Sequence, residues 1–239
     1  MFWKDLEWKS QIPLLMLEHS FAIVEINEDG AIHRETVHVK NTGRCRELLL
    51  EGARVVLSDG GNPQRKTKYD LIAVWKTGLG WINIDSQAPN AVAKEWLESG
   101  KSYFDGITYI KPEFVYGESR IDFYIEQKER RTLMEVKGCT LEIDREGYFP
   151  DAPTERGVKH LRELTGAVKK GYRACIAFVI AMEGIERVHP NVKMHPEFGR
   201  ALAEAVAAGV EILYLCCEVK KDELNIIKCL KETERKTLW

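Results

Sequence analysis

The chain of 239 residues is long enough for one large domain or two modest ones, each with its own hydrophobic core. Apolar residues make up 44% and charged residues 30%, which is ordinary for a globular protein in water. The net charge of −2 excludes a globally basic nucleic-acid coat protein, so any binding of phosphate must come from local clusters.

The first residues, the apolar runs and the cysteines indicate the cellular compartment in which the protein works. The first residues lack the basic and apolar regions of a signal peptide, and no apolar run approaches the length of a membrane span. We therefore expect a cytoplasmic protein that has no membrane partner. The six cysteines show no C-x-x-C spacing, so we expect reduced thiols, without zinc or a disulfide framework. The sequence does not predict the oligomeric state.

The first third of the chain reads as short strands. Apolar runs at 14–27, 31–39, 53–57, 69–75 and 81–84 are separated by turn-forming residues at 28–30, 60–63 and 77–80. Five short antiparallel strands without a long helix predict an all-β barrel of the OB type. We place a domain boundary near residue 88, so that residues 1–88 form an OB-fold-like, nucleic-acid-binding domain.

A local basic cluster supports that binding role. It consists of Arg44, Arg46, Arg65, Lys66 and Lys68, although residues 1–88 hold 11 Lys and Arg against 12 Asp and Glu. Aromatic residues lie nearby in the sequence, and an OB groove uses such side chains for stacking on bases. Two structural alternatives stay open: the tryptophans can be buried in the barrel, and the basic segment can pack against the second domain.

Residues 89–239 alternate between helical and strand-like segments. Asn90 is a suitable N-cap for a helix over 91–98, and a strand over 107–115 follows. An irregular segment at 147–151 precedes a helix over 153–170, a strand over 174–181, a helix over 196–208 and a strand over 210–219. This order predicts an α/β domain that has a mixed sheet with helices on its faces.

A β-hairpin within this second domain carries the most informative residues. The runs 120–125 and 133–137 alternate polar and apolar residues, which predicts two half-buried strands joined by the polar loop 127–130. A turn centred on Lys128-Glu129 places Asp122 directly opposite Glu135, with Cβ atoms roughly 5 Å apart. Ile121, Phe123 and Ile125 would then share the opposite face.

Two carboxylates at that separation repel each other unless a cation lies between them. Hard oxygen ligands in this arrangement suit Mg²⁺ or Mn²⁺, and the backbone carbonyl of Val136 could add a further ligand. Lys137 points to the same face as Glu135, where its ammonium could orient a water molecule or neutralise a phosphate. The alternative is an ordinary surface Glu-Lys pair, since Glu-x-Lys is common on exposed strands.

Several motifs, taken together and in order, resemble the sugar fermentation stimulation protein (SfsA) family. They are Asn41-Thr42-Gly43-Arg44, Arg65-Lys66-Thr67-Lys68-Tyr69, Tyr116-Gly117-Glu118-Ser119-Arg120-Ile121-Asp122, Glu135-Val136-Lys137, and the segment from Phe149-Pro150-Asp151 through Arg156, Lys159 and His160 to Leu161. The resemblance implies an OB-type domain joined to a PD-(D/E)xK, or restriction-endonuclease-like, domain. It also implies a DNA-binding protein connected with the regulation of sugar metabolism.

The resemblance also implies roles for individual residues. Asp122, Glu135 and Lys137 take the catalytic positions, and Asp122 and Glu135 share the metal with an additional acid, Glu95. Glu98 and Glu113 remain competitors for that third position, and an exposed helical glutamate is the alternative for Glu95. The residues expected to contact nucleic acid are Arg44, Arg65, Lys66, Lys68, Arg120, Arg156, Lys159 and His160.

Two functions follow from these features. The first is a DNA-binding protein with a Mg²⁺- or Mn²⁺-dependent nuclease site, which retention of Asp122, Glu135 and Lys137 favours. The second is a non-catalytic DNA-binding regulator with a silent nuclease fold. The near-neutral charge favours the second, as does His19-Ser20-Phe21, where the family tends to carry Asn-Arg-Phe. A nucleotide or sugar enzyme has little support, because no G-x-G-x-x-G, P-loop or Ser-His-Asp pattern is present.

Overall fold

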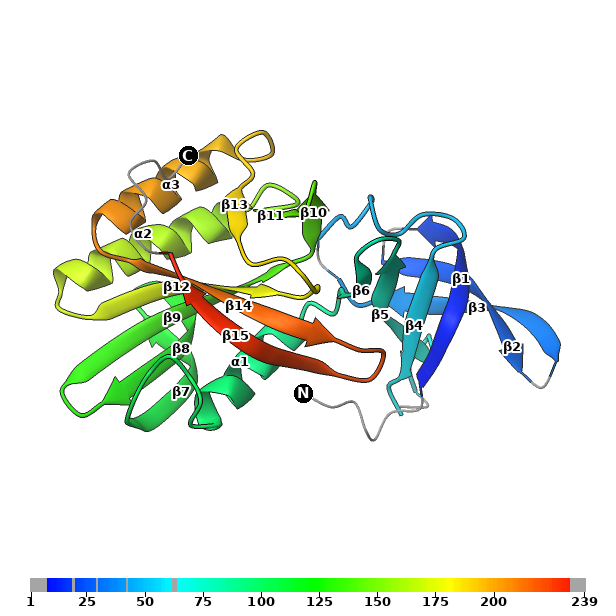
Figure 1. Cartoon of the computed structure of the whole chain (residues 1–239), viewed down its shortest axis with the longest axis horizontal. Helices are drawn as coiled ribbons and strands as arrows, with labels where there is room; N and C mark the ends of the chain where they lie inside the picture. The colour runs from blue at the N-terminus through cyan, green and yellow to red at the C-terminus, as the bar shows by residue number, and fades with distance from the viewer. Residues whose placement is uncertain (1–7, 19, 29, 42, 62–63, 233–239) are drawn as a thin grey trace.

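The computed structural model describes residues 8–18, 20–28, 30–41, 43–61 and 64–232, so His19 lies outside the described residues. Figure 1 shows a β-barrel and an α/β part side by side along the longest axis of the molecule. No helix in the described ranges is long and apolar enough to cross a membrane.

The first part is the predicted OB-type barrel, built from six strands. They are β1 (Trp8–Glu18), β2 (Phe21–Glu28), β3 (Ala31–Val39), β4 (Arg54–Asp59), β5 (Tyr69–Lys76) and β6 (Gly80–Asn83). The apolar run 14–27, predicted as one strand, is divided between β1 and β2, which pair as a hairpin. The prediction that all strands are antiparallel is also wrong, because β3 pairs with β5 in parallel and thereby closes the sheet.

The second part contains the predicted mixed sheet. Its elements are α1 (Ala88–Glu98), β7 (Ile107–Tyr116), β8 (Ser119–Gln127), β9 (Arg130–Cys139), β10 (Leu141–Ile143), β11 (Glu146–Phe149), α2 (Glu155–Lys169), β12 (Arg173–Ile180), β13 (Val188–Pro190), α3 (Pro196–Ala207), β14 (Glu211–Val219) and β15 (Leu224–Lys231). The large sheet has the order β15-β14-β12-β9-β8-β7, in which β12 runs parallel to both of its neighbours. The segment predicted as irregular contributes β11 to a separate three-stranded sheet.

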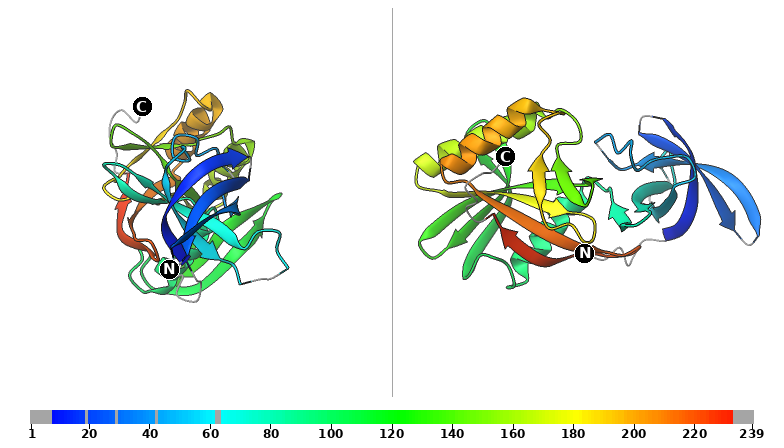
Figure 2. Two further views of the ribbon diagram at one scale, coloured as in Figure 1. Left: turned by 90° about the vertical axis from the view of Figure 1, so that its right-hand side faces the viewer. Right: turned by 45° about the horizontal axis from the view of Figure 1, so that its top comes forward.

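Helices cover both faces of the large sheet. Figure 2 shows α2 and α3 lying side by side on one face, and α1 lies on the other. Leu161 of α2 and Phe198 of α3 belong to one buried cluster, whereas Val92 and Trp96 of α1 belong to another. The sheet therefore separates two apolar layers, and its central strands are covered from both sides.

This covering corrects the prediction of half-buried strands at the hairpin. Tyr124 and Leu133 pack in the layer of α2, whereas their neighbours Phe123 and Met134 pack in the layer of α1. The predicted register is confirmed, since Phe123 pairs with Met134 and Tyr124 with Leu133 around a turn at residues 128–129. Ile121 lies in the layer of α2, so the expectation that it shares a face with Phe123 is wrong.

Polar contacts hold the barrel against the α/β part. The ammonium of Lys76, at the end of β5, donates to Oε2 of Glu142 on β10 over 2.5 Å. The guanidinium of Arg145, in the turn between β10 and β11, donates to the carbonyl of Gly78 over 2.9 Å. These contacts fix the position of the barrel relative to the sheet that carries the hairpin.

Candidate functional site

Asp122 lies at the start of β8, with both carboxylate oxygens held by neutral donors. The backbone amide of Val136 on β9 donates to Oδ2 over 2.8 Å, and the side-chain amide of Asn90 on α1 donates to Oδ1 over 2.8 Å. Burial raises the pKa of Asp122, and the negative charge of Glu135 raises it further, against opposition from Lys137 and the two donors. The site thus contains a carboxylate whose ionisation is costly until a cation compensates for it.

Glu135, on β9, is the most deeply buried acid of the site, with 1% of its surface exposed. Its Oε1 accepts from the ammonium of Lys137 over 2.5 Å and also contacts Nδ1 of His160. Burial alone would raise the pKa of Glu135, but the charge of Lys137 and the hydrogen bond from His160 outweigh it and lower the pKa. Glu135 is therefore ionised at neutral pH.

The second oxygen of Glu135 has no partner. Its Oε2 is buried and makes no hydrogen bond with any described group. An unsatisfied buried acceptor lowers the stability of the fold by about 1–3 kcal/mol, and by more when it is charged. A bound ligand that contacts this oxygen would remove that cost. Carboxylate oxygens from Asp122 and Glu135 are the hard donors that Mg²⁺, Mn²⁺ or Ca²⁺ take. These residues fit a divalent cation.

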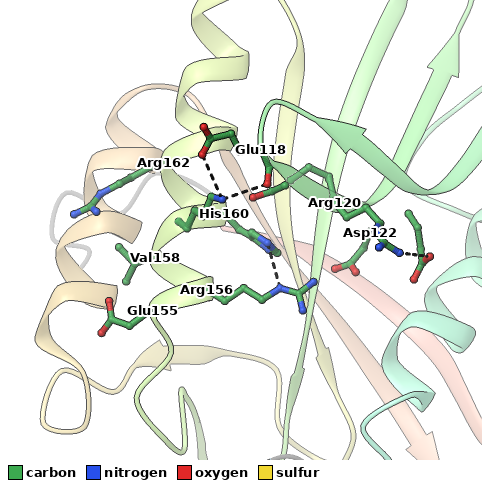
Figure 3. A pocket seen from close by; sticks show the side chains of 12 residues that line it. Glu118, Arg120, Asp122, Glu155, Arg156, Val158, His160 and Arg162 are labelled. Atoms are coloured by element: carbon green, nitrogen blue, oxygen red, sulfur yellow. Dashed lines mark hydrogen bonds and ion pairs between the residues drawn. The ribbon is translucent and has the colours of Figure 1, made fainter.

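Two hollows meet at this pair of acids, and Asp122 and Arg156 line both of them. The larger, about 780 Å³, lies over β8 and α2, and Figure 3 shows its lining residues. The other, about 420 Å³, lies between the two parts of the chain and includes Glu135 and Lys137. Its remaining wall comes partly from the barrel, through Asn41, Gly43, Asp85 and Ser86.

Hydrogen bonds in the segment after β3 shape the wall from the barrel. The side chain of Asn41 donates to the carbonyl of Ile84 over 2.6 Å and accepts from the amide of Gly43 over 2.5 Å. The next amide, that of Arg44, donates to Oδ2 of Asp151 over 2.9 Å. Arg44 is exposed and directly follows Gly43, which lines the hollow that contains the acids.

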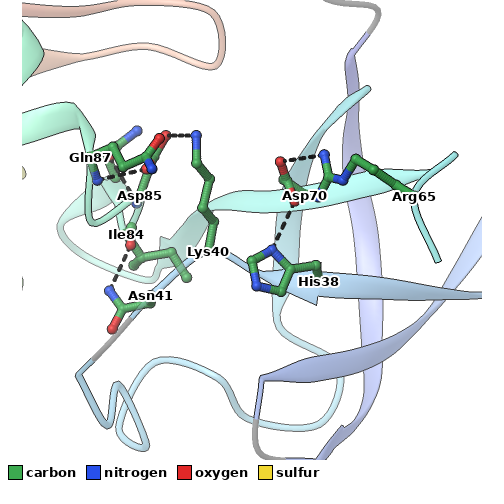
Figure 4. Close-up of polar contacts among 9 residues, drawn as sticks. His38, Lys40, Asn41, Arg65, Asp70, Ile84, Asp85 and Gln87 are labelled. Carbon is green, nitrogen blue, oxygen red and sulfur yellow. Dashed lines mark hydrogen bonds and ion pairs between the residues drawn. The ribbon is translucent and has the colours of Figure 1, made fainter. Parts of the chain in front are cut away.

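An ion pair holds buried Asp85, another residue of the same wall. The ammonium of Lys40 donates to Oδ2 of Asp85 over 2.9 Å, as Figure 4 shows. The other oxygen of Asp85 accepts the amide of Gln87, the residue before α1, over 2.8 Å. Asp85 is 2% exposed, and its two hydrogen bonds link Lys40 of the barrel to the start of α1, the helix that presents Asn90.

The three candidates for an additional metal-binding acid do not join Asp122 and Glu135 in the structure. Glu95 is exposed on α1 and lines neither hollow, and Glu98 forms an ion pair with Lys94 at 3.7 Å. Glu113 lines the larger hollow and pairs with Arg120 at 3.1 Å. The residue of α1 that reaches Asp122 is Asn90, which the sequence pattern predicts as an N-cap.

The prediction of Asn90 as an N-cap is wrong, because the helix begins earlier than predicted. The helix begins at Ala88 with Gln87 as its N-cap, so Asn90 lies within the first turn rather than before it. Proline is favoured at the first helical positions, so Pro89 was the signal that could have placed the predicted start earlier in the chain. Once the helix starts there, the side chain of Asn90 is directed to the sheet instead of to the helix amides.

Three of the predicted nucleic-acid contacts lie together. Arg120, Arg156 and Lys159 all line the larger hollow, and all three are exposed. Arg120 pairs with Glu113, and Lys159 donates to the backbone carbonyl of Glu118 over 3.3 Å, so Arg156 has the least engaged charge of the three. The structure therefore gathers these cations beside Asp122.

The basic cluster of the barrel is divided. Arg65 donates to both oxygens of Asp70, which is 8% exposed and also contacts His38 at 2.9 Å (Figure 4). That network ties the loop before β5 to the barrel, so Arg65 is engaged in the fold. Lys66 and Lys68 are exposed on the same loop, and none of the three lines the two hollows.

His160, predicted as a phosphate contact, has a different position. It is 3% exposed, and both ring nitrogens are engaged. Nδ1 contacts Oε1 of Glu135, and Nε2 lies 3.4 Å from Nε of Arg156 (Figure 3). Because Nε of arginine can only donate, Nε2 accepts, and the hydrogen of the neutral ring is on Nδ1. The ring therefore contacts the acid, and its small exposed part lines the larger hollow.

A second group of metal-binding residue types lies at the starts of α2 and α3. The side chains of Glu155, His195 and Glu197 bring one possible ligand atom each to within 4.8 Å of one another. The amide of Thr154 donates to Nδ1 of His195 over 3.3 Å, so the hydrogen of the neutral ring is on Nε2, which lies 3.3 Å from Oε1 of Glu155. Arg162 neutralises Glu197 at 2.5 Å. This group is a hydrogen-bonded contact between two helices, without a free imidazole lone pair for a metal.

Family comparisons agree with this two-part architecture. Residues 21–84 match the SfsA N-terminal OB domain, and residues 87–223 match the sugar fermentation stimulation protein RE domain. This chain belongs to the sugar fermentation stimulation protein family. The resemblance seen in the motifs is thereby confirmed, and so is the fold that it implied.

Relatives in this family are similar over most of their length. The sugar fermentation stimulation protein homolog of Desulfitobacterium hafniense is 52% identical over 203 residues, which cover 85% of this chain and 87% of the relative. The homolog of Clostridium beijerinckii is 50% identical over 86% of this chain and 88% of its own. Pyrococcus furiosus SfsA, solved in complex with Ca²⁺, is 26% identical with a TM-score of 0.77, and the match covers 97% of this chain and 95% of that one.

Proposed function

We propose that this SfsA-family chain binds DNA and holds Mg²⁺ or Mn²⁺ at Asp122 and Glu135 in order to hydrolyse phosphodiester bonds. The observation that carries the proposal is the orphaned, buried Oε2 of Glu135 at the hollow that Asp122 and Lys137 also line. The complex of P. furiosus SfsA with Ca²⁺ supports a site for hard cations in the family. We also propose that the division near residue 88 separates a DNA-binding domain from the nuclease-like domain.

Each residue has a task in this reaction. A divalent cation at the site would lower the pKa of a bound water and polarise a phosphoryl oxygen. Asn90 and the amide of Val136 keep the carboxylate of Asp122 in place for that cation. Lys137 supplies a positive charge at the same hollow, where it compensates for the negative charge that develops on the phosphate.

The charges of the hollow between the two parts explain why a cation must come first. Four acids line it, namely Asp85, Asp122, Glu135 and Asp151, against two cations, Lys137 and Arg156. A phosphate anion is repelled by this excess of negative charge, and a divalent cation removes the excess. We infer that productive binding of DNA at the acids depends on the cation.

The path of the nucleic acid follows from the exposed cations. Arg120, Arg156 and Lys159 line the larger hollow on one side of Asp122, and the exposed Arg44 directly follows Gly43, which lines the other hollow. Phosphate contacts of this kind position a strand without reading its sequence. The name shared by the relatives adds the proposal that the bound DNA serves regulation of sugar metabolism.

A cleavage assay tests the proposal. Wild type, Asp122→Asn, Glu135→Gln and Lys137→Met are incubated with single-stranded and duplex DNA and Mn²⁺, and cation binding is measured by calorimetry. We expect cutting by wild type alone, with cation affinity lost in Asp122→Asn and Glu135→Gln. Cation affinity that is unchanged in both acid variants would refute the site.

A non-catalytic DNA-binding regulator is the second candidate. One observation favours it: the ammonium of Lys137 is already bound to Glu135 over 2.5 Å, which leaves less positive charge for a phosphate. Under this alternative the wild-type protein binds DNA with a cation present but does not cut it. The same assay therefore separates the two functions.

A further inference from the structure

His160 touches both halves of the candidate site. Its Nδ1 contacts the cation ligand Glu135, and its Nε2 accepts from Arg156, which lines both hollows. The ring is 3% exposed and lies on the second turn of α2, a helix capped by Thr154, whose Oγ1 accepts the amide of Gly157 over 3.0 Å. One buried side chain therefore lies between a cation ligand and an exposed arginine.

The contact with Glu135 selects which carboxylate oxygen remains for the cation. His160 and Lys137 both occupy Oε1, and Oε2 is the atom without a partner. A histidine that bonds a metal-binding carboxylate fixes the orientation of that ligand, and removal of such outer partners lowers metal affinity. Without the ring, Glu135 would be free to rotate and to pair both oxygens with Lys137.

The contact with Arg156 orients a guanidinium in the same way. Arginine has five donors in a rigid plane, and here Nε is directed at His160. The two terminal nitrogens of that plane are then available to a phosphate in the hollows that Arg156 lines. Ordering the ring for one ligand thus also orders it for the other, which makes the binding of the two ligands cooperative.

We propose that His160 is a positioning residue that holds Glu135 for the cation and Arg156 for the phosphate, and so couples cation binding to nucleic-acid binding. The proposal rests on the proposed function, because it takes Glu135 as a cation ligand. It adds a residue that acts through others and a regulation of the site. By linkage, DNA should raise cation affinity by the same factor by which the cation raises DNA affinity.

Two substitutions separate the two contacts. His160→Asn keeps a side-chain N–H near the position of Nδ1 but has no atom at Nε2, so it retains only the contact with Glu135. His160→Gln places an amide near Nε2 and leaves the position of Nδ1 empty, so it retains only the contact with Arg156. Lys169→Ala, an exposed position on the same helix, is the matched control.

The experiment is a Ca²⁺ titration of the full chain by calorimetry, with and without a short oligothymidylate. The oligonucleotide should raise the Ca²⁺ affinity of wild type and Lys169→Ala by about 5-fold or more. His160→Gln should lose on the order of 10- to 100-fold in Ca²⁺ affinity without DNA. His160→Asn should keep that affinity within about 3-fold, by rescue of the Glu135 contact, but show a smaller enhancement by DNA than wild type, because only the part that comes from the charge of the cation remains.

A double-mutant cycle tests whether His160 and Arg156 enhance Ca²⁺ binding through the same contact. Arg156→Ala should reduce the enhancement as much as His160→Asn does, and the double variant should reduce it no further, because both remove one contact. Additive losses, a full enhancement in His160→Asn, or wild-type Ca²⁺ affinity in His160→Gln would each overturn the proposal. Thermal unfolding of every variant identifies a failure to fold, and wild-type Ca²⁺ affinity in Asp122→Asn would refute the proposed site separately.

Discussion

The side-chain amide of Asn90 donates to Oδ1 of Asp122 over 2.8 Å and thereby joins α1 to the strand that carries the first acid of the site. The contact connects a residue at the first turn of a helix with a sheet residue 32 positions later. It holds the carboxylate in one orientation, and its energetic value depends on that carboxylate being ionised.

Removal of this donor should weaken cation binding. Asn90→Ala is expected to lower the affinity for Ca²⁺ or Mn²⁺ on the order of 10-fold, because Asp122 loses an outer partner that orients it. Glu95→Ala, at an exposed position of the same helix, should leave the affinity unchanged. Calorimetric titration of both variants is the measurement, and the reverse ranking would restore Glu95 as the additional ligand.

The pH dependence of stability should reveal the raised pKa of Asp122. Burial and then the charge of Glu135 raise that pKa above its ordinary value of 3.8. Ionised Asp122 therefore lowers the free energy of unfolding at neutral pH, and this penalty disappears as the pH falls through the raised pKa to below the ordinary one.

Asp122→Asn removes that penalty. In the presence of a chelator, the variant is expected to have a higher free energy of unfolding than wild type at neutral pH, with the difference shrinking towards zero in acid. Urea unfolding at a series of pH values measures it. A variant that is less stable at neutral pH would show that the hydrogen bonds to Asp122 outweigh its burial and its repulsion from Glu135.

Gly43 should be required for the contact between the barrel and the α/β part. A Cβ at this position would overlap Oδ2 of Asp151, the acceptor of the Arg44 amide. Gly43→Ala is expected to cost about 1.5–3 kcal/mol of unfolding free energy, the value of a hydrogen bond to a charged group. Gly166→Ala is the control, since a Cβ there meets nothing within 4 Å, and it should stabilise α2 by about 0.5–1 kcal/mol. Equal effects of the two substitutions would contradict the steric argument.

Arg156 and Arg65 should respond differently to truncation. Arg156→Ala is expected to weaken DNA binding and to reduce the salt dependence by about one ion, because it removes a phosphate contact. Arg65→Ala should leave the salt dependence unchanged but cost about 1–3 kcal/mol of stability, since buried Asp70 loses its cation. Anisotropy titrations over a range of salt, together with urea unfolding, compare the two. A reduced salt dependence in Arg65→Ala would return Arg65 to the DNA-binding set.

Local patterns predicted the hairpin well and its surroundings less well. The turn at 128–129 and the pairing of Phe123 with Met134 followed from the lengths of the two apolar runs and the loop. The burial of the strands on both faces did not follow, because it depends on which helices cover the sheet. The small three-stranded sheet was missed because β11 pairs with β13, which is distant in the sequence. β15 was missed although it pairs with the preceding strand β14.

The sequence by itself determined the two kinds of fold and the residue types of the acid pair, because strand periodicity, turn length and ordered motifs are local properties. Only the tertiary structure decided that Asn90 holds Asp122, that Arg65 is engaged with Asp70 and that His160 faces Glu135. The first and the last of these contacts join elements that lie far apart in the chain, and the contact of Arg65 with Asp70 depends on the path that the loop before β5 takes in space. The same charged residue therefore serves as a phosphate contact, an ion pair or a positioning group according to its neighbours.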